Sequence, residues 1–89
     1  LEREGIRHRF VYAIALNDLG SPRDALTELN KLHRAFPREE QVLLALANYS
    51  AGLGEKEQAV SWARKLLALA PRNTNYQQLL RRLGRRSDP

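Results

Sequence analysis

The fold is decided by the segment LGSPRDALTELNKLHRAFP, residues 19–37, and by its counterpart LGEKEQAVSWARKLLALAP, residues 53–71. A shift of 34 residues superposes the two segments and extends the match on both sides. The identical pairs are Leu19 and Leu53, Gly20 and Gly54, Ala25 and Ala59, Lys31 and Lys65, Leu32 and Leu66, Pro37 and Pro71, Ala13 and Ala47, and Arg38 and Arg72. A fixed period of this size indicates stacked copies of one supersecondary unit.

The repeated residues are those that shape a helical hairpin. Gly20 and Gly54 stand where one helix must end and the chain must turn, because glycine takes a positive φ without a Cβ penalty. Ala25 and Ala59 fall in the first turns of the following helix, where a small side chain lets two helix axes approach closely. The proline that ends each segment closes that helix, since it lacks a backbone donor and clashes with the preceding turn.

The hairpins predict an all-α chain. Ser21 reads as an N-cap, with Pro22 at the first helical position and Asp24 three residues after the cap. Asn73 or Thr74 is expected to cap the last helix. We expect helices at 2–19, 22–36, 39–53, 55–70 and 74–83. They form one domain over 1–89, with repeat units at 6–39 and 40–73, a capping helix at 74–84 and a tail at 85–89.

The first helix of each hairpin is the more apolar one. Neither the run from Phe10 to Leu16 nor the run from Val42 to Ala47 contains a polar residue. A helix that is apolar all round is buried on more than one side. We therefore expect both first helices to be inner helices, each packed between its own partner and the next hairpin.

Composition and charge limit the possible functions. The 89 residues include no cysteine, which excludes disulfides and thiolate metal sites. No stretch approaches the roughly 20 apolar residues of a membrane span. Of the net charge of +5, residues 72–89 contribute +4, and no aromatic residue is interleaved with the arginine cluster at 81–86 to stack bases. This distribution argues against a nucleic-acid partner.

The 34-residue hairpin resembles the tetratricopeptide repeat family over roughly residues 6–84. The resemblance rests on small residues near the middle of the first helix, glycine at its end, alanine early in the second helix and proline at its close. The positions that define the repeat are Ala13, Gly20, Ala25, Pro37, Ala47, Gly54, Ala59 and Pro71. The chain departs from the family pattern at two places. Arg9 and Leu43 stand where the family has an early aromatic residue. In the second repeat the bulky residue is Trp62, one position before Ala63, where the family normally has it. The resemblance implies a right-handed α-solenoid of two antiparallel hairpins plus a closing helix.

The resemblance also implies a non-catalytic scaffold that binds a protein or peptide segment in a concave groove. By alignment, the groove positions include Phe10, Ile14, Asn17, Leu44, Asn48, Gln78 and Arg82. The basic clamp with which some members of the family capture a terminal carboxylate is missing here. What remains is an apolar strip of Phe10, Ile14 and Leu44 beside side-chain amides. Such a strip suits an apolar helix or an extended segment, or it is covered by a further repeat or a second copy.

A fainter resemblance is to the repeats that end certain bacterial multihaem cytochrome c proteins, carried by the phrases FVYAIAL at 10–16 and LLALA at 43–47. It implies an alternative function, a terminal structural segment of a larger protein with no binding role of its own. That reading would place the chain in the periplasm; otherwise the compartment, bacterial cytoplasm or periplasm, stays open. No Cys-x-x-Cys-His motif is present, so this segment holds no c-type haem.

No pattern of residues predicts catalysis, a metal site or a cofactor. His8 and His33 fall in different helices with no third ligand at a suitable spacing, so we interpret them as partly exposed surface histidines. Trp62 is spaced for packing with Ala59 and Leu66 rather than for ligand stacking. The arginines at 81, 82, 85 and 86 could bind phosphates or acidic tails, but we interpret them as a solvated last helical turn, where the helix dipole favours cations. The sequence therefore predicts a partner-binding module and no enzyme.

Overall fold

Five α-helices make up the part of the chain that the computed structural model describes, residues 2–84. They are α1 (Glu2–Asp18), α2 (Pro22–Ala35), α3 (Glu40–Gly52), α4 (Lys56–Leu69) and α5 (Thr74–Gly84). Between residues 2 and 84 there is no β-strand. Each expected helix is present, with both ends within one residue of the expected boundary. The expected tail at 85–89 lies outside the described residues.

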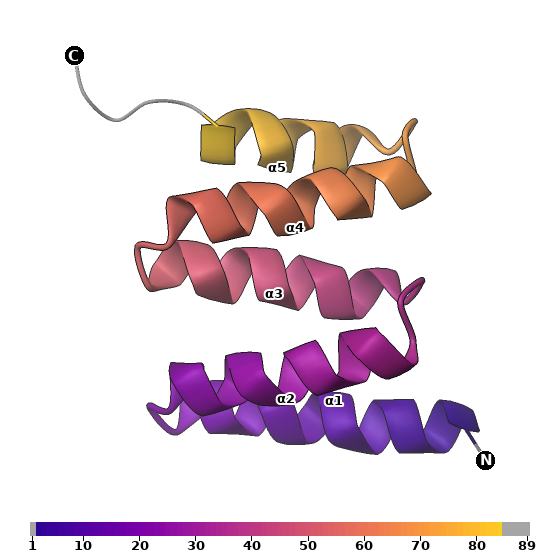
Figure 1. Ribbon diagram of the computed structural model, residues 1–89, viewed down its shortest axis with the longest axis vertical. Helices are drawn as coiled ribbons and strands as arrows, with labels where there is room; N and C mark the ends of the chain where they lie inside the picture. Colours follow the sequence, from indigo (N-terminus) through magenta and orange to yellow (C-terminus); the bar gives the residue numbers. More distant parts are fainter. Residues whose placement is uncertain (1, 85–89) are drawn as a thin grey trace.

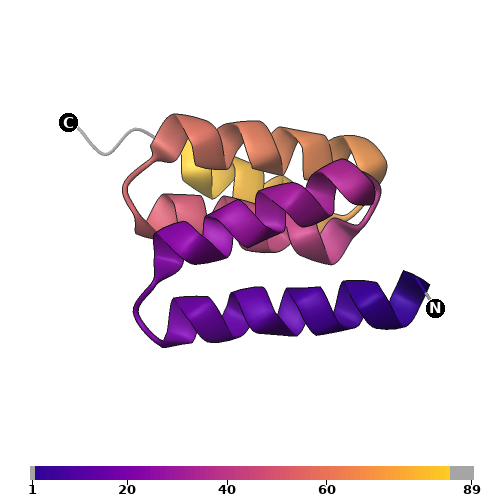
Figure 2. The same ribbon diagram turned by 60° about the horizontal axis from the view of Figure 1, so that its bottom comes forward.

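Each helix packs against the next one in the chain and runs antiparallel to it (Figure 1). The links between them are short, as at Phe36–Glu39 between α2 and α3, and short links place consecutive helices side by side. The turned view in Figure 2 shows α1 at one end of the molecule, with α2 lying between it and the rest. The architecture is therefore a row of antiparallel helices in which α3 has neighbours on both sides.

The turns after α1 and α3 have the same geometry. Gly20 and Gly54 have φ angles of 88° and 78°, the left-handed conformation that glycine adopts most readily. In the first turn the Ser21 N–H donates to the Leu16 carbonyl at 2.8 Å, and in the second the Glu55 N–H donates to the Ser50 carbonyl at 2.9 Å. These bonds satisfy carbonyls that the helix ends would otherwise leave unpaired.

The helix starts agree only in part with the expected caps. Asn73 caps α5, because its Oδ1 accepts a hydrogen bond from the Tyr76 N–H at 3.1 Å. Pro22 opens α2 as expected, but the Ser21 side chain makes no capping hydrogen bond. The Ser21 backbone, at φ −118° and ψ 62°, is outside the extended region that directs an N-cap side chain toward the helix. Pre-set proline geometry, rather than a serine cap, begins this helix.

The core combines leucines with fully buried alanines. Ala13, Ala25, Ala47, Ala59 and Ala63 each have 0% of their surface exposed. The leucines packed with them come from α2, α3, α4 and α5, namely Leu26, Leu29, Leu32, Leu43, Leu46, Leu66 and Leu79. Because a methyl side chain adds little thickness, buried alanine lets helix backbones approach closely.

The prolines at 37 and 71 follow the ends of α2 and α4 by two residues.

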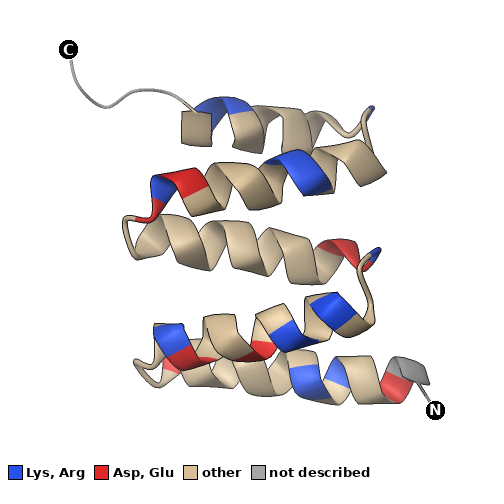
Figure 3. Cartoon of the chain, in the orientation of Figure 1, with Lys and Arg blue, Asp and Glu red and all other residues tan. Residues whose placement is uncertain are grey.

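The prediction that both first helices are inner helices is right for α3 and wrong for α1. In α3 the buried residues Val42, Leu43, Ala45, Leu46 and Ala47 take up more than half of the helix circumference. Figure 3 shows that the only charge on α3 is at its start. In α1, by contrast, Val11 is 58% exposed and Tyr12 is 56% exposed. The physical reason is position, since α3 lies between α2 and α4 whereas α1 packs closely against α2 alone.

Candidate partner-binding groove

A first hollow of about 310 Å³ lies between α1 and α3. Its lining residues are Ile6, Arg7 and Phe10 from α1, Glu39 from the link, and Gln41 and Val42 from α3. Val42 is buried, Ile6 and Phe10 are half-buried, and Arg7 and Gln41 are exposed. The hollow thus has an apolar base with charged and amide groups at its edge.

A second hollow, of about 430 Å³, lies between α3 and α5. It is lined by Leu44, Asn48, Asn73, Asn75, Tyr76, Gln78, Leu79 and Arg82. Asn48, Gln78 and Arg82 are exposed, while Leu44 is half-buried. This hollow is more polar than the first and contributes amides and one guanidinium.

One face of α3, which we call the α3 stripe, lines both hollows. Gln41 lines the first, and Leu44 and Asn48 line the second. These residues are three and four positions apart, so they lie on one face of the helix. Arg7 on α1 and Asn75 on α5 are the 34-residue equivalents of Gln41. The two hollows are therefore parts of one surface, which we call the groove and define as the residues lining both.

Five of the seven residues predicted for the groove line one of the hollows. They are Phe10, Leu44, Asn48, Gln78 and Arg82. Ile14 and Asn17 lie farther along α1, half-buried and outside both hollows. The prediction did not include Ile6, Val42, Tyr76 and Leu79, which also line the hollows. An amphipathic pattern gives no signal that separates the edge of a core from the base of a groove.

A hydrogen bond joins the α5 side of the second hollow to the start of α3. The Tyr76 hydroxyl donates to Glu40 Oε1 at 2.9 Å, joining α5 to the start of α3. Burial raises the pKa of Tyr76 above its ordinary value, and the hydrogen bond and negative charge of Glu40 add to the effect. The phenol therefore stays protonated and remains a donor at neutral pH.

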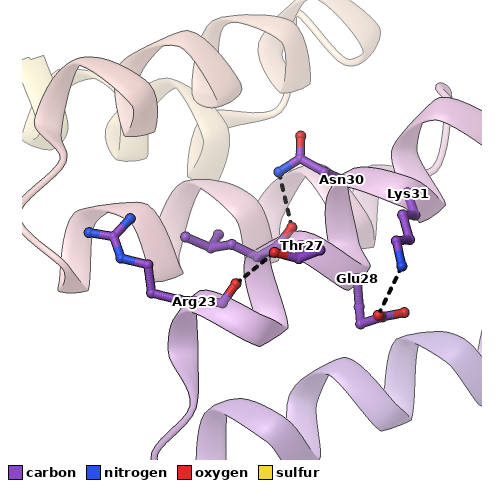
Figure 4. Close-up of polar contacts among 6 residues, drawn as sticks. Arg23, Thr27, Glu28, Asn30 and Lys31 are labelled. Atoms are coloured by element: carbon purple, nitrogen blue, oxygen red, sulfur yellow. Dashed lines mark hydrogen bonds and ion pairs between the residues drawn. The ribbon is translucent and has the colours of Figure 1, made fainter.

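A third hollow, of about 300 Å³, lies between α2 and α4 and shares no lining residue with the groove. Two of its polar side chains, Thr27 and Asn30, are bonded to carbonyls of α2 itself (Figure 4). Thr27 donates to the Arg23 carbonyl at 3.1 Å, and Asn30 donates to the Leu26 carbonyl at 3.0 Å. The Arg23 guanidinium pairs with Glu55, the residue before α4. This hollow offers a ligand fewer unengaged groups than the groove does.

His33 and Trp62 pack against each other where α2 meets α4. Their ring centroids are 5.2 Å apart in a T-shaped arrangement, and Lys65 Nζ lies 5.1 Å from the indole centroid. The His33 Nδ1 is buried without a hydrogen-bond partner among the described residues. Burial lowers the pKa of His33 below its ordinary value of 6.5, and the Lys65 charge lowers it further. Trp62 is half-buried, in the packing role the sequence predicted.

The remaining candidate residues, His8 and the arginines of α5, lie on different helices. His8 is exposed on α1, far along the chain from His33 on α2. In the described range no three His, Cys, Asp or Glu side chains gather in a way that could hold a metal ion. Arg81 and Arg82 are exposed in the last turn of α5, and Arg85 and Arg86 lie outside the described residues. From Glu2 to Gly84 no helix is both long and apolar enough to cross a membrane.

Fold and site together define a small all-α protein with a hollowed face shared by α1, α3 and α5. Neither a family model nor a curated protein sequence matches the chain. A functional assignment therefore depends on the geometry of the groove.

Proposed function

We propose that the chain is a non-catalytic protein-interaction module of the tetratricopeptide type, in which the helices form a right-handed α-solenoid and the groove holds a partner segment. The observation that carries the proposal is the pair of hollows on either side of the α3 stripe. Equivalent positions of the 34-residue repeat supply both of them. A surface built by the repeat itself can contact an elongated ligand at regular intervals.

The lining residues specify the chemistry of the partner. An apolar side chain fits the first hollow, where Phe10, Ile6 and Val42 offer contact area. The amides of Asn48 and Gln78 in the second hollow can donate to and accept from the backbone of an extended segment. Arg82 at the far end favours a carboxylate. We expect a segment with a large apolar residue followed by an acidic one.

The lining side chains are suited to binding rather than to catalysis. Glu39 is the single carboxylate in the lining, with no second acid or base beside it in the groove. The amides and the two guanidinium groups do not titrate near neutral pH and so cannot pass protons as general acids or bases. The Tyr76 phenol, with its raised pKa, stays protonated. A protein or peptide, held without covalent change, is the ligand that this set of groups favours.

Two neighbouring arginines provide a matched test. Arg82 lines the groove, whereas Arg81 lies outside both hollows although it is exposed in the same helical turn. We expect Arg82→Glu to reduce capture of partners from a lysate of the source organism at least several-fold. Arg81→Glu makes the same change in net charge and should leave capture unaltered. Equal losses for both variants would reduce the effect to net charge and refute the groove.

The apolar end of the groove needs a separate variant. The double substitution Phe10→Ser with Leu44→Ser removes one half-buried apolar side chain from each hollow. We expect the captured partners to be lost while circular dichroism still reports a helical, cooperatively unfolding chain. Unchanged capture by a folded double variant would exclude the groove as the site. Loss of folding would show that both residues belong to the core. The comparison of Arg82→Glu with Arg81→Glu would then be the test of the groove.

A further inference from the structure

One face of α1 is apolar and uncovered, and it is not the groove face. Among the described residues, the large apolar side chains with the greatest exposure are Val11 at 58%, Tyr12 at 56% and Leu19, just past the helix end, at 81%. Ala15 is exposed between them. Positions 11, 12, 15 and 19 lie on one side of the helix, about half a turn from Phe10 and Ala13. We call these four residues the outer face of α1.

The internal repeat offers a comparison, because the second hairpin contains the equivalent face. The 34-residue equivalents of the outer face are Ala45, Leu46, Tyr49 and Leu53. Ala45 is 7% exposed and Leu46 is 0% exposed, while Tyr49 and Leu53 are half-buried against the core. These residues belong to α3, which packs against the preceding helix α2 (Figure 1). The same positions are therefore covered in the second hairpin and open in the first.

We propose that the outer face of α1 is a docking surface for an amphipathic α-helix of the α2 type, running antiparallel to α1. The template is the α2–α3 pair, in which α2 contributes the buried residues Leu26, Leu29 and Leu32 at three-residue steps. The docking helix needs a similar row of leucines or phenylalanines and a polar opposite side. This surface is independent of partner binding in the groove.

A second copy of the chain is a poorer occupant. The leucine-bearing faces of α2 and α4 are already buried within the molecule, with Leu29, Leu32 and Leu66 at 0% exposed. A second copy could therefore offer its own outer face, pairing α1 with α1. Stable dimers bury about 1,200–2,000 Å² in total, about 20–30 residues on each side, whereas each outer face offers four residues. A tethered helix avoids the entropy cost of association, and it can dock on a smaller area.

The test supplies the helix in tethered form. Joining residues 1–39 directly to residues 6–89 places a copy of α2 ahead of the inner copy of α1, and it keeps the 34-residue period. We expect the extended chain to unfold in urea in one transition, with a steeper urea dependence than the parent chain because more surface is buried. The substitutions Val11→Ser and Leu19→Ser, made in the inner copy, should lower its urea midpoint several times more than the same pair lowers the parent midpoint.

The control substitution is Arg7→Ser, because Arg7 is exposed in α1 and its equivalent Gln41 is exposed in α3. Arg7→Ser should shift the urea midpoints of the parent and the extended chain by the same small amount. Equal shifts for the Val11 and Leu19 pair in the two chains would overturn the proposal. So would an added hairpin that stays unfolded or melts separately. Sedimentation equilibrium that finds the parent chain dimeric, with the dimer lost in Leu19→Ser, would assign the face to self-association instead.

Discussion

Gly20 and Gly54 are constrained by their backbone and not by crowding. Both have positive φ, and a Cβ added at either would meet no atom within 4 Å. We expect Gly20→Ala and Gly54→Ala each to lower the free energy of unfolding by about 1–2 kcal/mol, the cost of a left-handed alanine. Urea denaturation followed by circular dichroism measures it.

Gly52 is the matched control for this prediction. It lies two residues from Gly54, inside the last turn of α3, with equally open space and without a positive φ. Gly52→Ala should raise the free energy of unfolding by about 0.4–1 kcal/mol, because it restricts the unfolded chain. A similar cost at positions 52 and 54 would contradict the assigned turn geometry.

His33 should make stability depend on pH. Its pKa is lower in the folded chain than the ordinary 6.5, because burial and then Lys65 disfavour the charged ring. The unfolded chain therefore binds the proton more readily, and stability is lost as pH falls through about 6.5 toward the folded pKa. Above that window the ring is neutral in both states and contributes no pH dependence.

The measurement compares melting temperatures at about pH 7.5 and about pH 5.5, where most carboxylates are still ionised. The parent chain should lose stability over this interval. His33→Phe keeps an aromatic ring against Trp62 but cannot titrate, so its loss should be smaller. The control His8→Phe alters an exposed histidine and should retain the parent's dependence. An unaltered pH dependence in His33→Phe would contradict the assignment.

Residue-level features were predictable where they are local. The glycine turns, the Asn73 cap and the half-buried Trp62 follow from neighbouring sequence. The Ser21 cap was predicted wrongly, because the sequence motif does not determine the ψ angle of 62° that the turn imposes. The bond from Tyr76 to Glu40 joins residues 36 positions apart, and no local pattern indicates it.

At the scale of elements, buried alanines set how closely the helices pack. Ala59 in α4 is 0% exposed at the position equivalent to Ala25 in α2. We expect Ala59→Leu to destabilise the chain by about 1–3 kcal/mol, since three added carbon atoms must displace packed neighbours. Ala68→Leu makes the same change on the exposed side of α4 and should be within about 0.5 kcal/mol of the parent. Equal urea midpoints for the two variants would show that α4 is placed wrongly.

The comparison of α1 with α3 shows where sequence patterns stop being informative for an element. Both helices contain an uninterrupted apolar run, and both runs predicted burial on more than one side. Only α3 is enclosed, because α2 and α4 flank it. Hydrophobic periodicity reports which surface a helix can bury, whereas the neighbours present decide which surface is buried.

For the whole molecule, the 34-residue period predicted the order of the helices and five of the residues that line the groove. Equivalent positions on α1, α3 and α5 could be aligned because one repeat generates them. The hollows themselves could not be predicted from the period, because each lies between helices that are not consecutive in the chain, as the second does between α3 and α5. Ile14 and Asn17 share the aligned face but lie beyond the first hollow, so periodicity gives the direction of a side chain and not the extent of the site.

The central claim, that a partner segment lies in the groove, is tested most directly by site-specific photo-cross-linking. A photoreactive residue replaces Asn48 or Gln78, which are exposed in the second hollow, or Gln58, which is exposed in the hollow between α2 and α4. After irradiation in a lysate of the source organism, the account predicts covalent adducts of the same partner from positions 48 and 78 and none from position 58. Adducts from position 58, with none from the two groove positions, would contradict it.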